Sequence, residues 1–292
     1  MKKSGRSLLL DLIRIVSISL VIGDHILQHL TNPTARLLIQ SFGIKGFYWT
    51  NMGSVGVTLF LILSGMALEY NHGKEKIKYF SFIAKRFTRI YSTYWLCILF
   101  SIPLVGIEIF PHNFKDIFLN LSGLFIYTGR PWTDYFIPTA FFLGIILYLY
   151  FLFPLISKAM KQRPTLTILS LLIISVAARL YMGHQTIMFR PTDSYPLARV
   201  FEFGFGIWIV NQKKAFSIIA VWGQNIKTNF FQILSELSFP AFLMHSALLR
   251  LNLINPSEPK ITITKFLELT LVLSFAIYAL DKLVQKKIFR KN

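Results

Sequence analysis

The segment LDLIRIVSISLVIGDHILQHL, residues 10–30, decides the fold class of this chain. It is apolar over the length that a helix needs to cross the ~30 Å hydrocarbon core of a bilayer, about 20 residues. Its ionisable side chains include Asp11, Arg14, Asp24 and His25. An ionisable group in a span costs ~2.5–3.5 kcal/mol on insertion scales. We therefore interpret this segment as a membrane span that holds functional residues.

Similar apolar runs follow along the whole chain of 292 residues, of which 54% are hydrophobic and 15% charged, with a mean hydropathy of +0.54. This pattern predicts an all-α, polytopic transmembrane helix bundle that forms one integral domain over residues 1–292. The eight expected spans are residues 8–30, 53–70, 89–110, 136–157, 165–182, 195–211, 230–253 and 262–283. Two shorter apolar pieces, 116–128 and 215–222, are expected to be re-entrant or interfacial, and ten spans result if both cross.

The charges are strongly unbalanced, with 31 Lys and Arg against 13 Asp and Glu and a net charge of +18. Because the basic residues cluster beside apolar runs, they indicate membrane orientation rather than a nucleic-acid partner. With eight spans, 20 of the 31 Lys and Arg residues lie on the side of both termini and 7 on the other, which predicts cytoplasmic termini. The single cysteine, Cys97, excludes an intramolecular disulfide, a Cys metal cluster and a dithiol redox site, and no metal is expected.

Two charged residues of the first span share one helix face. Arg14 and His25 are eleven residues apart, which places them roughly 20° past three full turns and about 16 Å apart along the axis. One stripe thus connects the expected cytoplasmic side with the external side, as a reaction across the bilayer requires. The alternative is that Asp11 pairs with Arg14 at the interface and that His25 is only a helix-end residue.

Four blocks, in order along the chain, resemble motifs of the bacterial integral-membrane acyltransferase type 3 family. They are residues 10–30 with Arg14 and His25 separated by ten residues, VGVTLFLILSGMAL (55–68) with Ser64 and Gly65, FIAKRFTRIYSTYWL (82–96) with Arg86 and Arg89 as Arg-x-x-Arg, and LSFPAFLMHSALL (237–249) with His245. Where many members carry a Trp and a Glu, this chain has Phe141 and Ile146, and the region after residue 211 is short by a span.

This resemblance implies transfer of an acyl group, commonly acetyl, from a cytoplasmic acyl-CoA such as acetyl-CoA to a hydroxyl of a surface or cell-envelope glycan. It implies a protein of the bacterial inner membrane whose partners are the lipid bilayer, the acyl-CoA donor and the glycan, without a bound cofactor. The oligomeric state stays open. A polytopic transporter or flippase, with the Arg14 to His25 stripe lining its pathway, is the alternative.

The roles of the central residues follow from the resemblance and from their chemistry. His25 is the expected base that accepts the proton of the attacking hydroxyl, and Arg14 supplies positive charge to the thioester or to the donor. Arg86 and Arg89, with Ser64, are expected to bind acyl-CoA, although the arginines also fit positive-inside anchoring. Direct transfer and an acyl-enzyme on His25 or Ser64 both remain open.

Five residues are expected to support this site, namely Asp11, Asp24, Arg199, Glu202 and His245. The spacing of Arg199 and Glu202 favours a structural ion pair within a span. His245 fits a hydrogen bond to a neighbouring helix as well as a contact with substrate. Gly65 is more typical of close helix packing than of donor access. On the outer side, a sugar-binding surface or an interfacial aromatic belt is expected from His112, Asp116, Trp132, Asp134, Tyr135, His184 and Asp193.

Overall fold

The computed structural model describes residues 8–29, 52–73, 78–105, 113–124, 135–184, 195–212, 229–251, 253–254 and 258–289. All regular elements in these ranges are helices, so the all-α class is confirmed for this part of the chain. The long helices are α1 (Leu8–His29), α3 (Met52–His72), α4 (Tyr79–Val105), α6 (Phe141–Gln162), α7 (Pro164–His184), α8 (Val200–Asn211), α10 (Asn229–Leu249) and α11 (Pro259–Phe289). Shorter elements are α5 (Phe114–Ser122) and the 3-10 turns η5 (Pro138–Ala140) and η7 (Leu197–Arg199).

Among the residues that the structure describes, four helical segments are long and apolar enough to cross a membrane, as expected of a membrane protein. They are Met52–His72, Pro138–Gln162, Pro164–Met182 and Lys260–Ile288. Each of the eight predicted spans overlaps one helix, with α8 only 12 residues long, and eight to ten crossings remain a prediction. Helix α4 begins at Tyr79, ten residues before the predicted span, so that the basic Arg86 and Arg89 belong to the helix itself.

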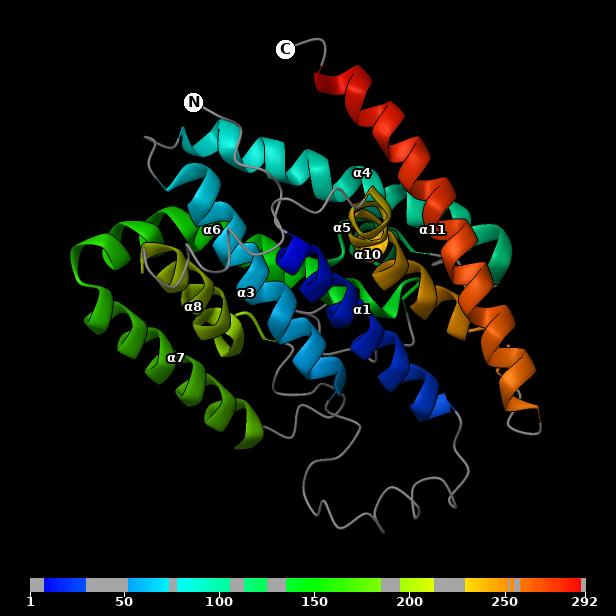
Figure 1. Ribbon diagram of the computed structural model, residues 1–292, viewed down its shortest axis with the longest axis horizontal. Coiled ribbons are helices and arrows are strands. Elements are labelled where there is room, and N and C mark those ends of the chain that lie inside the picture. Colours follow the sequence, from blue (N-terminus) through cyan, green and yellow to red (C-terminus); the bar gives the residue numbers. More distant parts are fainter. Residues whose placement is uncertain are drawn as a thin grey trace.

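The helices pack in a row that runs α7, α8, α3, α1, α10 and α11, and α6 and α4 pack against this row (Figure 1). Helix α6 is the most enclosed candidate span, with 67% of its apolar window buried, whereas α7 and α11 at the two edges have 11% and 22%. The exposed apolar side chains of α7 and α11 are therefore the surface that lipid would cover.

The apolar piece 116–128 does not form a span in the residues described. Its helix α5 has nine residues, about 14 Å, which is less than half of a ~30 Å core. The side chains of Tyr91, Tyr94 and Trp95 on α4 donate hydrogen bonds to carbonyls of α5 at Ser122, Asn120 and Leu121. These bonds satisfy the last carbonyls of α5 and hold it against α4. The piece 215–222 lies outside the described residues.

Helices α3 and α8 approach each other at two glycines. A Cβ added at Gly65 would collide with the carbonyl oxygen of Phe203, and one added at Gly206 would collide with that of Ile62. Each glycine thus lies against the backbone of the other helix, as small residues do where membrane helices pack closely. Gly65 has the packing role that its residue type favours, and this contact fixes α3 where Ser64 enters the site described next.

Candidate active site

A cavity of about 780 Å³ opens at the end of the bundle where α1, α4 and α10 begin and where α3 and α11 end. We call this the cavity end. Its wall includes four residues singled out in the sequence, Arg14, Ser64, Arg86 and Arg89, which come from three different helices. The fold therefore brings the first three motif blocks to one space. A volume of this size lies within the range of small-molecule sites, about 300–1,000 Å³.

The α4 side of the cavity is basic. Arg86 is half-buried and Arg89 is exposed, one turn apart on the same helix. The Nη2 atom of Arg86 lies 2.7 Å from Nε2 of His72, and its guanidinium lies 5.5 Å from the centre of the Phe82 ring. Burial lowers the pKa of Arg86 from its ordinary value, and the charge of Arg89 acts in the same direction. An anionic ligand between the two arginines is thus electrostatically favoured.

A further wall of the cavity comes from α10 and α11 and was missed in the sequence. Lys282 Nζ lies 3.0 Å from Glu236 Oε2, and Tyr278 donates to the same carboxylate. Asp281 Oδ2 accepts hydrogen bonds from Thr93 (2.9 Å) and from Gln285 (2.7 Å). In the sequence these residues are the charged end of a span, and only the packing of α11 against α4 and α10 makes them part of a cavity wall.

Arg14 lies on the cavity wall and also next to Asp11. Its Nη1 atom is 3.9 Å from Asp11 Oδ1, the outer limit of an ion pair, and 35% of its side chain is exposed. Asp11 itself is buried. The ion pair between Asp11 and Arg14, which the sequence offered as the alternative, is thus present. It is long, and Arg14 also lines the cavity.

His25 lies outside the cavity lining and contacts His245 on α10. Its Nδ1 atom is 2.8 Å from Nε2 of His245, and the two rings are nearly parallel, with centroids 5.1 Å apart and planes 19° apart. Because Arg14 and His25 both meet α10 or the cavity that α10 lines, the two side chains share the α10 side of α1. This placement agrees with the shared helix face predicted from their spacing.

Three phenylalanines lie between the cavity and the histidine pair. Phe60 and Phe142 line the cavity, and both rings pack against Phe242 at centroid distances of 6.2 and 5.3 Å. The Phe242 ring in turn lies 6.0 Å from that of His245. We call Phe60, Phe142 and Phe242 the aromatic trio; it separates the polar cavity from the imidazoles.

The side chain of Asp24 points away from His25, as expected for adjacent residues on a helix. Its Oδ2 atom accepts a hydrogen bond from Gln28 at 3.0 Å, and the same atom lies 2.7 Å from the position that a Cβ on Gly53 would take. Asp24 therefore faces α3, whereas His25 faces α10. The carboxylate next to His25 in sequence is not its partner in the fold.

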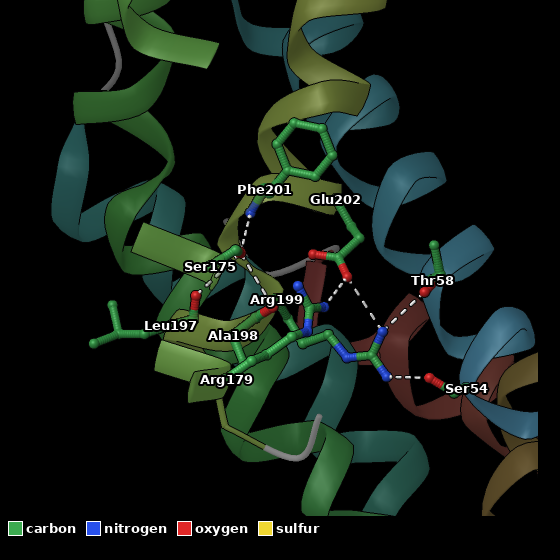
Figure 2. A network of polar contacts seen from close by, with 9 residues as sticks. All are labelled: Ser54, Thr58, Ser175, Arg179, Leu197, Ala198, Arg199, Phe201 and Glu202. Carbon is green, nitrogen blue, oxygen red and sulfur yellow. Dashed lines mark hydrogen bonds and ion pairs between the residues drawn. The ribbon is translucent and has the colours of Figure 1, made fainter. Parts of the chain in front are cut away.

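The predicted pair of Arg199 and Glu202 is part of a larger buried network (Figure 2). Arg199 Nη1 lies 3.3 Å from Glu202 Oε1, and a second guanidinium, that of Arg179 on α7, lies 2.5 Å from the same oxygen. Arg199 also donates to Ser54 at 2.7 Å and to Thr58 at 2.8 Å on α3. The network joins α3, α7 and α8, so a structural ion pair is the role that its geometry supports.

A second buried carboxylate, Glu69, was not singled out in the sequence. It accepts a hydrogen bond from Ser157 at 2.6 Å and from Asn211 at 3.3 Å, and Lys161 lies 3.5 Å away. It links α3, α6 and α8 near the cavity end. Among the residues that the structure describes, no group of three or more His, Cys, Asp or Glu side chains is placed to hold a metal ion.

The expected outer surface is only partly visible. His112, Trp132, Asp134 and Asp193 and the side chain of His184 lie outside the described residues. Asn113 caps α5 and accepts a hydrogen bond from the backbone N–H of the half-exposed Asp116, and Tyr135 is fully buried. Tyr135 therefore offers no surface for a sugar, and the expectation of a sugar-binding face remains a prediction.

Comparison with protein families gives one match, to an acyltransferase domain of the acyltransferase 3 family, over residues 8–217. None of the curated proteins and none of the solved structures matches the chain. The matched range includes α1, α3 and α4 with Arg14, His25, Ser64, Arg86 and Arg89. Helices α10 and α11, which supply His245 and the Lys282 wall, follow the matched range.

Proposed function

The chain belongs to the acyltransferase 3 family, and from this premise we propose that it moves an acyl group from acyl-CoA to a hydroxyl of a cell-envelope glycan. A membrane acyltransferase follows from the family and the apolar helices. The donor acyl-CoA, acetyl as the group transferred, the glycan acceptor and a bacterial inner membrane with cytoplasmic termini belong to the proposal.

The observation that carries the proposal is the cavity with three arginines on its wall. Acyl-CoA has an anionic nucleotide end and a long neutral arm that ends in a thioester. Arg86 and Arg89 stand at the wide, exposed part of the cavity and suit the phosphates through forked guanidinium contacts. The arm would then extend past Ser64 toward Phe60 and Phe142, where the wall becomes apolar.

The reaction needs a base, and His25 is the residue proposed for it. Its imidazole takes the proton of the acceptor hydroxyl while the hydroxyl oxygen forms a bond to the thioester carbonyl carbon. The carbon–sulfur bond then breaks, and the departing thiolate takes the proton from the imidazolium of His25. Removal of the proton by a positioned base contributes about 10²- to 10⁴-fold.

Arg14 would stabilise negative charge on the thioester side. It stands on the cavity wall and on the same side of α1 as His25, and its ion pair with Asp11 is loose at 3.9 Å. A positive group in a site of low dielectric stabilises a developing oxyanion more than it would in water. In this proposal the thioester must pass or displace the aromatic trio to meet His25.

The test is a comparison of cell-envelope polysaccharides from cells with and without the protein by mass spectrometry. Loss of an ester with the mass of an acetyl group supports the proposal, and an unchanged glycan contradicts it. The purified protein in nanodiscs should also bind acetyl-CoA, measured by calorimetry. Uptake of a glycan or ion into vesicles without ester formation would instead indicate the transporter function.

A further inference from the structure

The half-buried imidazole of His25 and the buried imidazole of His245 touch directly, and their hydrogen bonds have a direction. His245 is completely buried, and its Nδ1 atom lies 3.0 Å from the carbonyl oxygen of Ala241, one turn earlier on α10. Its Nε2 atom lies 2.8 Å from Nδ1 of His25. A carbonyl oxygen can only accept a hydrogen bond, so Nδ1 of His245 must carry a hydrogen.

The hydrogen on Nδ1 of His245 determines which of the other ring nitrogens carry a hydrogen. Nδ1 of His245 carries a hydrogen because it donates to Ala241, so in the neutral ring Nε2 of His245 carries the lone pair. A lone pair on that nitrogen needs a donor at 2.8 Å, and the donor is Nδ1 of His25. With its hydrogen on Nδ1, neutral His25 carries its own lone pair on Nε2.

We propose that His245 is a positioning residue for His25, which it holds in the tautomer whose basic nitrogen is Nε2. The role of His25 as base rests on the proposed function, whereas the tautomer does not. When Nε2 of His25 takes a proton, the bond from its Nδ1 to His245 becomes charge-assisted and stronger. His245 thus stabilises the protonated base by accepting its hydrogen bond, as a carboxylate does in other catalytic sites, but without the negative charge of a carboxylate.

The neighbouring carboxylate does not supply this function. Asp24 points toward Gly53 on α3 and is held by Gln28. The orienting group therefore comes from α10 and lies 220 residues further along the chain than His25. A neutral imidazole in this place adds no second charge to a buried site, where an imperfectly paired carboxylate is expensive.

Contacts next to His245 fix the rotation of helix α10 about its own axis. Thr139 of η5 donates to the carbonyl of Phe242 at 2.9 Å and lies 2.8 Å from the hydroxyl of Ser246. Phe242 lies three residues before His245, and Ser246 lies one residue after it. The contact with η5 therefore fixes the direction in which the His245 ring points.

Two amide variants separate positioning from simple packing. In His245→Gln the amide oxygen reaches about as far as Nε2 and can still accept from His25. In His245→Asn the amide ends near the Nδ1 position and cannot replace Nε2 of His245 as the acceptor for Nδ1 of His25. We expect kcat for acyl transfer to fall less than about tenfold in the Gln variant and about 10²- to 10⁴-fold in the Asn variant.

The KM for acyl-CoA should change little in either variant, because neither histidine lines the cavity. Equal kcat in the Gln and Asn variants, with both inserted and folded, would overturn the proposal. So would a parallel loss of donor affinity, because that would indicate general disruption of α10.

A spectroscopic measurement tests the tautomer without any assay of activity. The full chain, with its six histidines labelled with ¹⁵N, is reconstituted in lipid nanodiscs, and the His25 signals are assigned by their absence in His25→Ala. We expect a protonated Nδ1 and an unprotonated Nε2 for His25, and loss of this preference in His245→Asn. A protonated Nε2 in the natural protein overturns the inference. The expected tautomer in a protein that transfers no acyl group instead leaves the inference standing and removes the proposed function.

Discussion

The two ends of α1 lie in opposite surroundings. At the cavity end, Arg14 faces a space of about 780 Å³ among charged side chains, several of them exposed. Toward the other end, His25 lies against a fully buried imidazole, and the aromatic trio closes off the cavity. Under the proposed function, the charged, water-soluble donor binds in the first environment and the base of defined tautomer lies in the second. Donor binding and proton transfer would then be separated along one helix.

The sharpest way to break this comparison is His25→Ala. We expect acyl transfer to fall by about 10²- to 10⁴-fold, because the base is lost, while the affinity for acyl-CoA stays unchanged. Ester formation on the glycan and calorimetric binding of acetyl-CoA measure the two properties in the same preparation. Normal ester formation in the inserted variant would remove His25 from the mechanism, and lost binding would show that the two ends are not separate.

The second largest effect is expected for the two arginines at the cavity end. The double variant Arg86→Ala with Arg89→Ala should weaken binding of acetyl-CoA by about 10²-fold, because two charge-assisted hydrogen bonds to phosphate are removed. Binding of acetyl-pantetheine, which lacks the nucleotide, should hardly change. Arg163→Ala is the matched control, an exposed arginine at the end of α6 that does not line the cavity. Equal losses for the two thioesters would favour membrane anchoring over phosphate binding.

Much of this contrast follows from the sequence, and the part that does not depends on distant contacts. The apolar runs predict the long helices, and the spacing of Arg14 and His25 predicts their common side. The start of α4 at Tyr79 was missed because apolarity marks the membrane part of a helix, whereas backbone hydrogen bonds continue beyond it. The pairing of His25 with His245 is set by tertiary packing, which no local pattern encodes.

The packing that carries Ser64 into the cavity gives the third prediction. Gly65→Ala should destabilise the protein by about 1–3 kcal/mol, because the new methyl group meets the backbone of α8 at Phe203. The matched control is Gly23→Ala on α1, where an added Cβ finds open space and helix propensity favours alanine by about 1 kcal/mol. Thermal unfolding in detergent compares the two variants. A Gly65→Ala protein as stable as Gly23→Ala would show that α3 and α8 can separate without cost.

The smallest expected effect concerns the α11 wall, which lies beyond the matched family range. Lys282→Ala should weaken binding of acetyl-CoA by about two- to fivefold, since an exposed cation that already pairs with Glu236 contributes less than about 1 kcal/mol. Lys286→Ala, one turn further on α11 and outside the cavity lining, should have no effect. The difference between the two variants should shrink as salt is added, because exposed charges are screened. Identical binding by both variants would restrict the donor site to α1, α3 and α4, and α11 would then only enclose it.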